Sequence, residues 1–234
     1  MNGPQVLADP DAVARAAAEH ILKSAASAIG ATGGFRIGLS GGRTPERLYR
    51  LLGTPGMATR VAWEKVSFFF SDERDAPPNE PDSQYWVTRK LLMEPVGARP
   101  DHIHRMKADA HDLEAAAREY DARLDPPLDL LLLGVGRDGH IASIFPGSPL
   151  VRERRQRVAA VTDSPRPPRR RLTVTPRAID EAREVMVLAT GSDKAVVLVR
   201  VFAEEPDVAA IPAGLLREAK WLVDRAAAEI LNRS

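Results

Sequence analysis

Short apolar runs alternate with segments of helical spacing along most of the chain. Runs such as 66–70 and 130–133 are too short and too apolar to be anything but buried strands, whereas apolar residues three or four positions apart predict helices. Asp9 or Asp11 can cap an Ala-rich helix that runs to about Ile29, where glycines end it. The remaining predicted strands are 35–39, 158–162, 172–175, 185–189 and 221–223, and the remaining predicted helices are 46–52, 85–93, 113–124, 178–182, 194–202 and 226–231.

Strands that alternate with helices predict the fold class. They favour an α/β fold of three layers, in which a mostly parallel sheet carries helices on both faces. We expect one domain over residues 1–234, because the Pro- and Arg-rich stretch 164–171 is more simply an exposed loop than a boundary.

Composition excludes several classes of function. Lys plus Arg (33) nearly balance Asp plus Glu (32), so no global field attracts nucleic acid or an acidic membrane. With no cysteine, the chain has no disulfide, no thiolate nucleophile and no Cys-based zinc site. The first residues lack a signal-peptide pattern, and no apolar stretch approaches the roughly 18 residues of a membrane span. We therefore expect a cytoplasmic protein.

The turn after strand 130–133 contains Gly134-x-Gly136-x-x-Gly139, the spacing of a dinucleotide-binding turn. That interpretation requires a long helix after the last glycine, but Pro146 and Pro149 interrupt the segment. A nucleotide cofactor is therefore disfavoured. Asp138 and His140 flank Gly139 instead, and a histidine at a strand end can act as a general base. From this segment alone, a capping aspartate and a surface histidine are equally acceptable.

Two other turns suit an anion. In SGGRTP (40–45), Gly41 and Gly42 follow a strand, with Thr44 expected as N-cap and Pro45 at the first helical position. Backbone N–H groups at such a helix start suit a phosphate, although an ordinary strand–helix turn explains the pattern too. In GSDKA (191–195), Lys194 in the first helical turn opposes the helix dipole, so it is either solvated or holds an anion.

Charged side chains follow two further strands. Asp72, Glu73 and Arg74 come directly after strand 66–70, and Arg74 there can clamp an anion or polarise a carbonyl. In RRRLTVT, Arg171 and Thr173 share a polar face with Thr175, which aims one arginine at a definite place. His102 and His104 have no third ligand at recognisable spacing, so we assign them a structural role and predict no metal site.

These motifs, SGGRTP, SDERDAPPNEPDSQY, GVGRDGHIASIFPGSP, RRRLTVT and GSDKA, together and in this order resemble the 6-phosphogluconolactonase family, which is related to the glucosamine-6-phosphate isomerase/deaminases. The resemblance covers about residues 12–225. It implies a Rossmann-like domain that binds no nucleotide and needs no metal or cofactor. The implied reaction is hydrolysis of the sugar-phosphate lactone 6-phospho-D-glucono-1,5-lactone, in the oxidative branch of the pentose phosphate pathway. A small molecule is thus the expected partner, with no nucleic acid and no membrane, and the oligomeric state is left open.

The same resemblance implies roles for individual residues. His140 would be the general base, with Asp138 and Asp72 placing and polarising the site and Arg74 near the lactone. The phosphate would lie on Gly41, Gly42 and Thr44 beside Arg43, gripped by Arg171 and Lys194. Many relatives have Asn where this chain has Gln84, so no role is assigned to that residue.

Two alternative functions stay open. A deaminase-like enzyme would carry a glutamate at the position of Phe145 and would typically lack a run like Asp72–Arg74. Both features favour ester hydrolysis, on family resemblance alone. The other alternative is a non-catalytic sugar-phosphate-binding module, for which a base beside the reacting carbon has no use.

Overall fold

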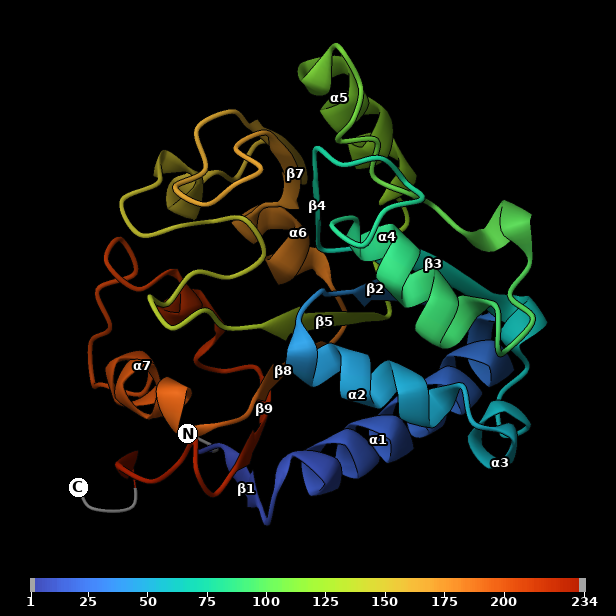
Figure 1. The fold of residues 1–234 in the computed structure, drawn as a ribbon, viewed down its shortest axis with the longest axis horizontal. Helices are drawn as coiled ribbons and strands as arrows, with labels where there is room; N and C mark the ends of the chain where they lie inside the picture. The colour runs from blue at the N-terminus through green and yellow to red at the C-terminus, as the bar shows by residue number, and fades with distance from the viewer. Residues whose placement is uncertain (1–2, 232–234) are drawn as a thin grey trace.

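A parallel sheet of six strands forms the centre of the structure (Figure 1), a computed structural model in which residues 3–231 are described. Its strand order is β1-β9-β8-β5-β2-β3, and every neighbouring pair is parallel. The strands are β1 (Gln5–Leu7), β2 (Phe35–Leu39), β3 (Val66–Phe70), β5 (Leu130–Gly134), β8 (Val185–Ala189) and β9 (Lys220–Asp224).

Helices flank this sheet and complete the predicted α/β architecture. The longest, α1, begins after Asp9, whose carboxylate accepts a 2.7 Å hydrogen bond from the Ala12 N–H, and ends at Gly33 with φ of +84°. It packs against α2, β2 and β9. The α-helices are α1 (Pro10–Thr32), α2 (Arg43–Leu52), α3 (Pro55–Ala58), α4 (Gln84–Thr88, continued by a π-helical turn Arg89–Met93), α5 (Leu113–Arg123), α6 (Pro176–Glu181) and α7 (Ala195–Val201).

A second, antiparallel sheet stands beside the first and was not predicted from the sequence. Its strands are β4 (Asp72–Arg74), β7 (Arg171–Val174) and β6 (Val158–Val161), in the order β4-β7-β6. The first of them covers Asp72–Arg74, three charged residues that the sequence predicted to follow strand 66–70 and not to form a strand. The alternation along β7 is as predicted, but Thr173 and Thr175 are as fully buried as Leu172 and Val174. The polar face of β7 is therefore covered by other parts of the protein. Thr173 Oγ1, for example, accepts a hydrogen bond from the Ser143 N–H.

The helix predicted over 226–231 is wrong. That segment forms turns after β9. The Asp224 carboxylate accepts hydrogen bonds from the N–H groups of Ala227 and of Gly191, which belongs to a different turn. Asp224 thus fixes the segment locally to the neighbouring turn, and Ala227 and Ala228 become buried without a helix.

The arrangement of strands determines where a site can form. The neighbouring strands β8, β5 and β2 all point the same way, so the turns that follow them meet at one edge of the sheet. The antiparallel sheet brings β4 and β7 to the same region, with Arg74 paired in register with Arg171. Among residues 3–231, no helix combines the length and the hydrophobicity that crossing a bilayer requires.

Close packing between β2 and β5 gives a test of the sheet. A Cβ on Gly38 would lie 2.7 Å from the Leu131 Cδ1 and 2.8 Å from the Leu128 Cδ1, both in the buried core. We expect Gly38→Ala to lower the free energy of unfolding by about 1–3 kcal/mol through overpacking. For a chain of this size, each kcal/mol corresponds to a decrease of roughly 2–4 °C in Tm, which thermal unfolding measures.

The matched control for this change is Gly30→Ala in α1, where a Cβ would meet nothing within 4 Å. That substitution should leave Tm unchanged or raise it slightly, because alanine favours a helix over glycine. Equal destabilisation by both substitutions would contradict the packing argument.

Candidate active site

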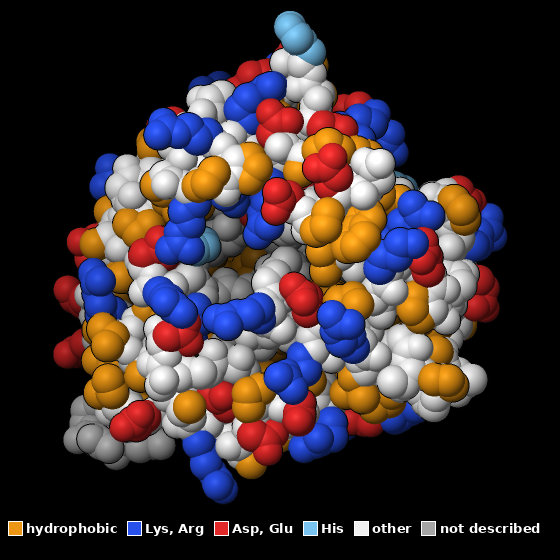
Figure 2. Space-filling model, in the orientation of Figure 1, with side chains coloured by type: hydrophobic (Ala, Val, Ile, Leu, Met, Phe, Trp, Pro, Cys, Tyr) orange, Lys and Arg blue, Asp and Glu red, His pale blue; other side chains and the backbone are white. Residues whose placement is uncertain are grey.

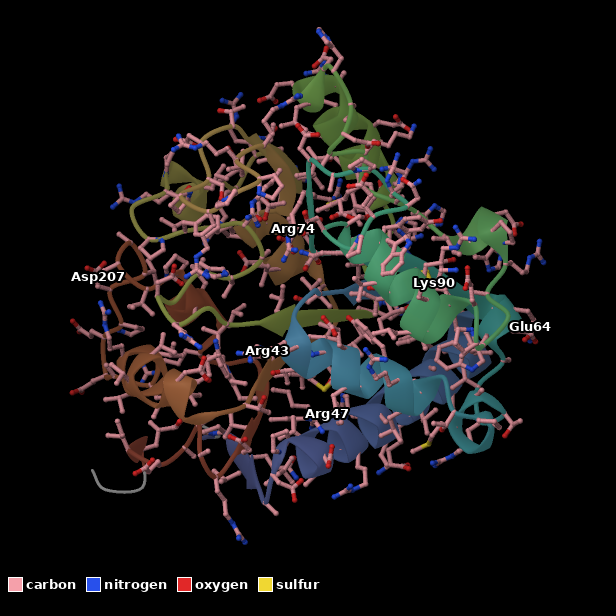
Figure 3. The ribbon with its side chains drawn as sticks, in the orientation of Figure 1. Arg43, Arg47, Glu64, Arg74, Lys90 and Asp207 are labelled. Carbon is pink, nitrogen blue, oxygen red and sulfur yellow. The ribbon has the colours of Figure 1, made fainter. Side chains whose placement is uncertain are left out.

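A pocket of about 440 Å³ opens at the edge of the sheet where the turns after β2, β5 and β8 meet. Figure 2 shows the corresponding hollow near the middle of this face, rimmed largely by Lys and Arg side chains. In Figure 3, Arg74 and Arg43 lie near the middle of the same face, although Arg74 belongs to β4 of the antiparallel sheet and Arg43 begins α2. The residues that line this pocket and no other described pocket are Ser40, Asp72, Arg74, Gln84, Gly136, His140, Ala142, Arg166 and Arg171.

A second pocket of about 490 Å³ adjoins the first. It extends toward the starts of α1 and α2, where Thr44, Arg47 and Thr190 line it. The residues shared by both pockets are Gly41, Gly42, Arg43, Gly134, Val135, Arg137, Asp193 and Lys194. Every site residue predicted from the sequence lines one of the two pockets except Asp138, which contacts His140 instead.

The turn after β5 is shaped by its glycines. Gly139 has φ of +88°, and the Gly136 N–H donates to the His140 carbonyl at 2.8 Å, which closes the turn on itself. A Cβ on Gly136 would lie 2.0 Å from the His140 Nδ1. The glycine spacing therefore serves to bring an imidazole against the backbone. The segment that follows forms further turns, which is why the motif does not open a long helix.

His140 and Asp138 form a hydrogen-bonded pair in this turn. The distance from His140 Nδ1 to Asp138 Oδ1 is 2.5 Å, and the His140 N–H reaches the same oxygen at 3.3 Å. Partial burial opposes ionisation of Asp138, but the hydrogen bonds from His140, the electrostatic interaction with that residue and the positive charge of Arg166 outweigh it. The pKa of the Asp138 carboxyl is therefore lowered from its ordinary value. Because an ionised carboxylate only accepts, Nδ1 carries the proton and Nε2 is the free nitrogen.

Asp72 is held by neutral donors at the buried end of the pocket. Its Oδ2 accepts from the Ser143 Oγ at 2.7 Å, and its Oδ1 accepts from the Gln84 Nε2 at 2.9 Å. The side chain is only 3% exposed, yet it lines the pocket. The carboxylate is thus fixed in orientation by hydrogen bonds rather than by an ion pair.

The neighbouring Glu73 does not belong to the pocket. It accepts hydrogen bonds from the Arg74, Gln84 and Tyr85 N–H groups and from the Ser83 hydroxyl, and so satisfies the start of α4. Burial raises the pKa of the Glu73 carboxyl, and these hydrogen bonds oppose the shift. Its contribution is structural.

Arg171 lies at the same end of the pocket as Asp72. Its guanidinium donates to the carbonyls of Arg166, Pro167 and Pro168, and to the Ser143 Oγ at 3.4 Å. It also lies 5.7 Å above the ring of Phe145, which in turn is 4.8 Å from the His140 ring. Burial lowers the pKa of Arg171, while the charge of Asp72 opposes that shift. The donors of this arginine are therefore largely engaged by the protein.

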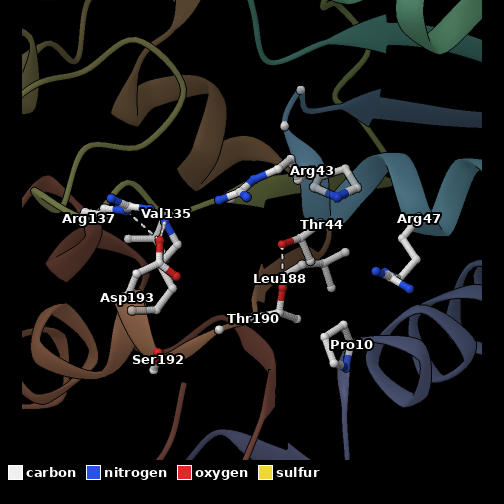
Figure 4. A pocket seen from close by; sticks show the side chains of 16 residues that line it. Pro10, Arg43, Thr44, Arg47, Val135, Arg137, Leu188, Thr190, Ser192 and Asp193 are labelled. Carbon is white, nitrogen blue, oxygen red and sulfur yellow. Dashed lines mark hydrogen bonds and ion pairs between the residues drawn. The ribbon is translucent and has the colours of Figure 1, made fainter. Parts of the chain in front are cut away.

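Lys194 lies in a different charged group. The Asp193 carboxylate is 2.6 Å from the Arg137 Nε and 3.7 Å from the Lys194 Nζ, and Figure 4 shows the Arg137–Asp193 pair facing the cleft. Burial lowers the pKa of Lys194 and the charge of Asp193 opposes this, while Arg43 and Arg137 add positive charge. This end of the cleft thus gathers the positive charges of Arg43, Arg137 and Lys194 around one carboxylate, that of Asp193.

The expectation that Thr44 caps α2 is wrong. The N-cap is Gly42, with φ of +108° and no side-chain cap, and the helix begins at Arg43. The Thr44 Oγ1 instead hydrogen-bonds the Thr190 Oγ1 at 2.7 Å, which ties α2 to the turn after β8 (Figure 4). The first N–H groups of α2 consequently have no side-chain acceptor, as an anion site requires.

Several pocket residues were missed from the sequence. Gln84 lines the pocket, and Ser143 lies behind it as a partner of Asp72. Both residues lie inside recognised motifs, but only their contacts with Asp72 show what they do. Arg137 and Asp193 stand inside recognised motifs, so their charge was a usable signal. For His104, the ring stacks on Phe69 at 4.5 Å, in agreement with a structural role. Across residues 3–231, His, Asp and Glu side chains nowhere gather in a group of three or more suited to a metal ion.

Comparisons with known proteins show which sequences and folds this chain resembles. A family model described as glucosamine-6-phosphate isomerases/6-phosphogluconolactonase matches residues 8–223. A 6-phosphogluconolactonase of Streptomyces coelicolor is 34% identical, over 97% of this chain and 93% of that protein.

Among solved structures, that of a 6-phosphogluconolactonase from Trypanosoma brucei matches with a TM-score of 0.85 at 28% identity, covering 99% of both chains. A monomeric glucosamine-6-phosphate deaminase matches with a TM-score of 0.86 at 22% identity, over 98% of this chain and all (100%) of that one, which shows the fold alone.

The lowered pKa of Asp138 predicts a pH dependence of stability. Because its folded pKa lies below the ordinary value of 3.8, its contribution is complete above that pH and is lost as the pH falls toward the folded pKa. We expect Asp138→Asn to have a lower Tm than the wild type at pH 7, with the difference shrinking on acidification to pH of about 3. Thermal unfolding across this range measures it, and a difference that grows on acidification would contradict the assignment.

Proposed function

The chain belongs to the glucosamine-6-phosphate isomerase/6-phosphogluconolactonase family, and we propose that it hydrolyses 6-phospho-D-glucono-1,5-lactone to 6-phospho-D-gluconate. One observation carries the proposal. The same pocket has the His140–Asp138 pair at one end and a group of positively charged side chains, which includes Lys194, at the other. A phosphorylated lactone has the two features that such a pocket distinguishes: an electrophilic carbonyl carbon and a remote dianion.

In the proposed mechanism, His140 activates water. With Nδ1 bonded to Asp138, Nε2 accepts a proton from a water molecule, whose oxygen attacks the lactone carbon C1. The carbonyl becomes an oxyanion, which Arg74 is placed to stabilise from the wall of the same pocket. The bond between C1 and the ring oxygen then breaks, and the ring oxygen takes the proton from the imidazolium. The released acid ionises to the carboxylate of the product.

Asp72 and Asp138 have different parts in this proposal. Asp138 fixes the tautomer of His140 and stabilises the imidazolium that forms. Asp72 faces the pocket with its orientation fixed by Ser143 and Gln84, so it can accept a hydrogen bond from a sugar hydroxyl. Substrate held at several points brings C1 close to the base, which accounts for much of the rate of such reactions.

The phosphate is proposed to lie at the start of α2. Gly41 and Gly42 offer backbone N–H groups, Arg43 and Thr44 begin the helix, and Lys194 supplies a partly buried positive charge. Arg171 lines the pocket as a further cation, whose guanidinium is already held by loop carbonyls and therefore contributes charge from a fixed place. Binding energy from the phosphate, which is remote from C1, positions the lactone for attack.

Phe145 favours this reaction over the deaminase alternative. The side chain is 5% exposed and its ring lies between His140 and Arg171. A carboxylate expected there for ring opening is replaced by an apolar ring, so no second acid–base group adjoins His140 on that side. A binding module without catalysis is disfavoured by the aligned His–Asp pair.

The proposal is tested by a lactonase assay on the purified protein, corrected for spontaneous lactone hydrolysis. We expect turnover of 6-phosphogluconolactone without added metal, no loss of rate with a chelator, and much weaker turnover of unphosphorylated gluconolactone because the anion site is then empty. Release of ammonia from glucosamine 6-phosphate without lactonase activity would overturn the assignment.

His140→Ala should lower kcat by about 10²-fold or more with little change in KM, because a general base contributes about 10²–10⁴-fold. His111, which is exposed and lines neither pocket, supplies the control His111→Ala, which should retain wild-type kinetics. Steady-state kinetics on both variants measure the effect. Wild-type kcat in His140→Ala would refute the mechanism even if the substrate is right.

Lys194→Ala should raise KM about 10–100-fold with a smaller effect on kcat, because a hydrogen bond to a charged group is worth about 1.5–3 kcal/mol. The same variant should barely change the rate on unphosphorylated gluconolactone. Lys23→Ala, at an exposed position of α1, serves as the control for loss of a lysine. A KM unaffected by Lys194→Ala would place the phosphate elsewhere.

A further inference from the structure

The loop between β6 and β7 carries the Pro- and Arg-rich stretch, and its backbone is held in place. The Ser164 hydroxyl accepts from the Arg166 N–H at 3.3 Å and donates to the Arg166 carbonyl at 2.9 Å. The Arg171 guanidinium donates to the carbonyls of Arg166, Pro167 and Pro168. Prolines restrict the same backbone further. The Arg166 side chain therefore starts from a fixed point beside the pocket.

From that point, Arg166 reaches the carboxylate that holds His140. Its Nη2 lies 2.9 Å from the Asp138 Oδ2, and its side chain lines the pocket. Both hydrogen bonds from His140 go to the other oxygen, Oδ1. Within residues 3–231, Arg166 is the one hydrogen-bond donor to Oδ2. The two oxygens of Asp138 are thus divided between the base and this arginine.

The other arginines of the loop have no comparable contact. Arg170 pairs with Asp75 at 3.3 Å and donates to the carbonyls of Ala110 and His111, outside both pockets. Arg169 is exposed and lines neither pocket. Arg166 alone among the three extends from the loop to the His–Asp pair.

We propose that Arg166 is a positioning residue that acts through Asp138 on His140, an inference that rests on the proposed function. A carboxylate held at one oxygen can rotate about its Cβ–Cγ bond, whereas one held at both oxygens keeps Oδ1 aimed at Nδ1. Because Arg166 is half exposed, its ion pair with Asp138 adds little to the stability of the fold. Its effect is on the orientation of the pair, which is a kinetic property.

Direct contact with substrate is the competing role for Arg166, because its side chain lines the pocket. The two roles predict different kinetics. A residue that acts through Asp138 changes kcat and loses its effect once Asp138 no longer carries a carboxylate. A residue that binds the substrate anion changes KM, and does so whether or not Asp138 is ionised.

The decisive experiment is a double-mutant cycle between Arg166→Met and Asp138→Asn, with kcat and KM measured on 6-phosphogluconolactone. We expect Arg166→Met to lower kcat about tenfold with KM nearly unchanged, and the double variant to match Asp138→Asn alone. Arg166→Lys, which keeps the charge, should recover most of the lost rate, and Arg169→Met should behave as wild type. Losses that multiply in the double variant, a selective rise of KM, or no effect of Arg166→Met would each overturn the proposal.

A readout independent of turnover separates this proposal from the proposed function. The His140 Nδ1 proton, assigned by its absence in His140→Ala, should give a downfield proton NMR resonance in the wild type and in Arg166→Lys and Arg169→Met. We expect that resonance to weaken in Arg166→Met and to vanish in Asp138→Asn. An inactive wild type with this pattern would refute only the lactonase assignment, and a resonance unchanged in Arg166→Met would refute the positioning role.

Discussion

The hydrogen bond between His140 and Asp138 depends on a chain reversal that only glycine permits at two points. Gly139 has φ of +88°, and a Cβ on Gly136 would lie 2.0 Å from the His140 Nδ1. The imidazole can therefore approach the turn closely enough for Nδ1 to reach a carboxylate two positions earlier. The spacing of the glycines resembles a dinucleotide turn because both need close approach to backbone, although here the approaching group is the protein's own side chain.

Much of the fold could be predicted because hydrophobic periodicity depends on neighbours in the sequence. Strands β2, β3 and β8 of the parallel sheet have the predicted bounds. Helix α1 is capped by Asp9 as expected and ends at Thr32, three residues beyond its predicted last residue, Ile29, with Gly33 as its C-cap. The antiparallel sheet could not be predicted in this way, because β4 is a charged segment that is a strand only through its pairing with β7. Its neighbours in space, not its composition, decide its conformation.

The candidate site also combines features that follow from the local sequence with features that depend on contacts in space. The charged and glycine residues of the recognised motifs converge because strand ends β2, β5 and β8 are adjacent in the sheet. The residues that orient Asp72 lie in the same motifs but have neutral side chains, which gave no sign of their role. Ser143 and Gln84 hold Asp72 by hydrogen bonds. A Cβ on Gly41 would lie 2.5 Å from the Gln84 Cδ, so the Gln84 side chain, which is longer than asparagine, fits here only against a glycine. Such contacts depend on three-dimensional distance and leave no pattern along the chain.

The fold is shared with a deaminase structure at a TM-score of 0.86, so the choice between reactions must be made within the pocket. There, Phe145 keeps an apolar surface between the His140 and Arg171 side chains. A carboxylate in its place would lie close to the positive charge of Arg171 and to His140, and would compete with Asp138 for the imidazole. With a phenyl ring there, Asp138 is the acid that His140 contacts, and the imidazole has one hydrogen-bonded nitrogen and one available for water. A single buried ring thereby leaves His140 with Asp138 as its acidic partner, which is the arrangement that the proposed hydrolysis requires.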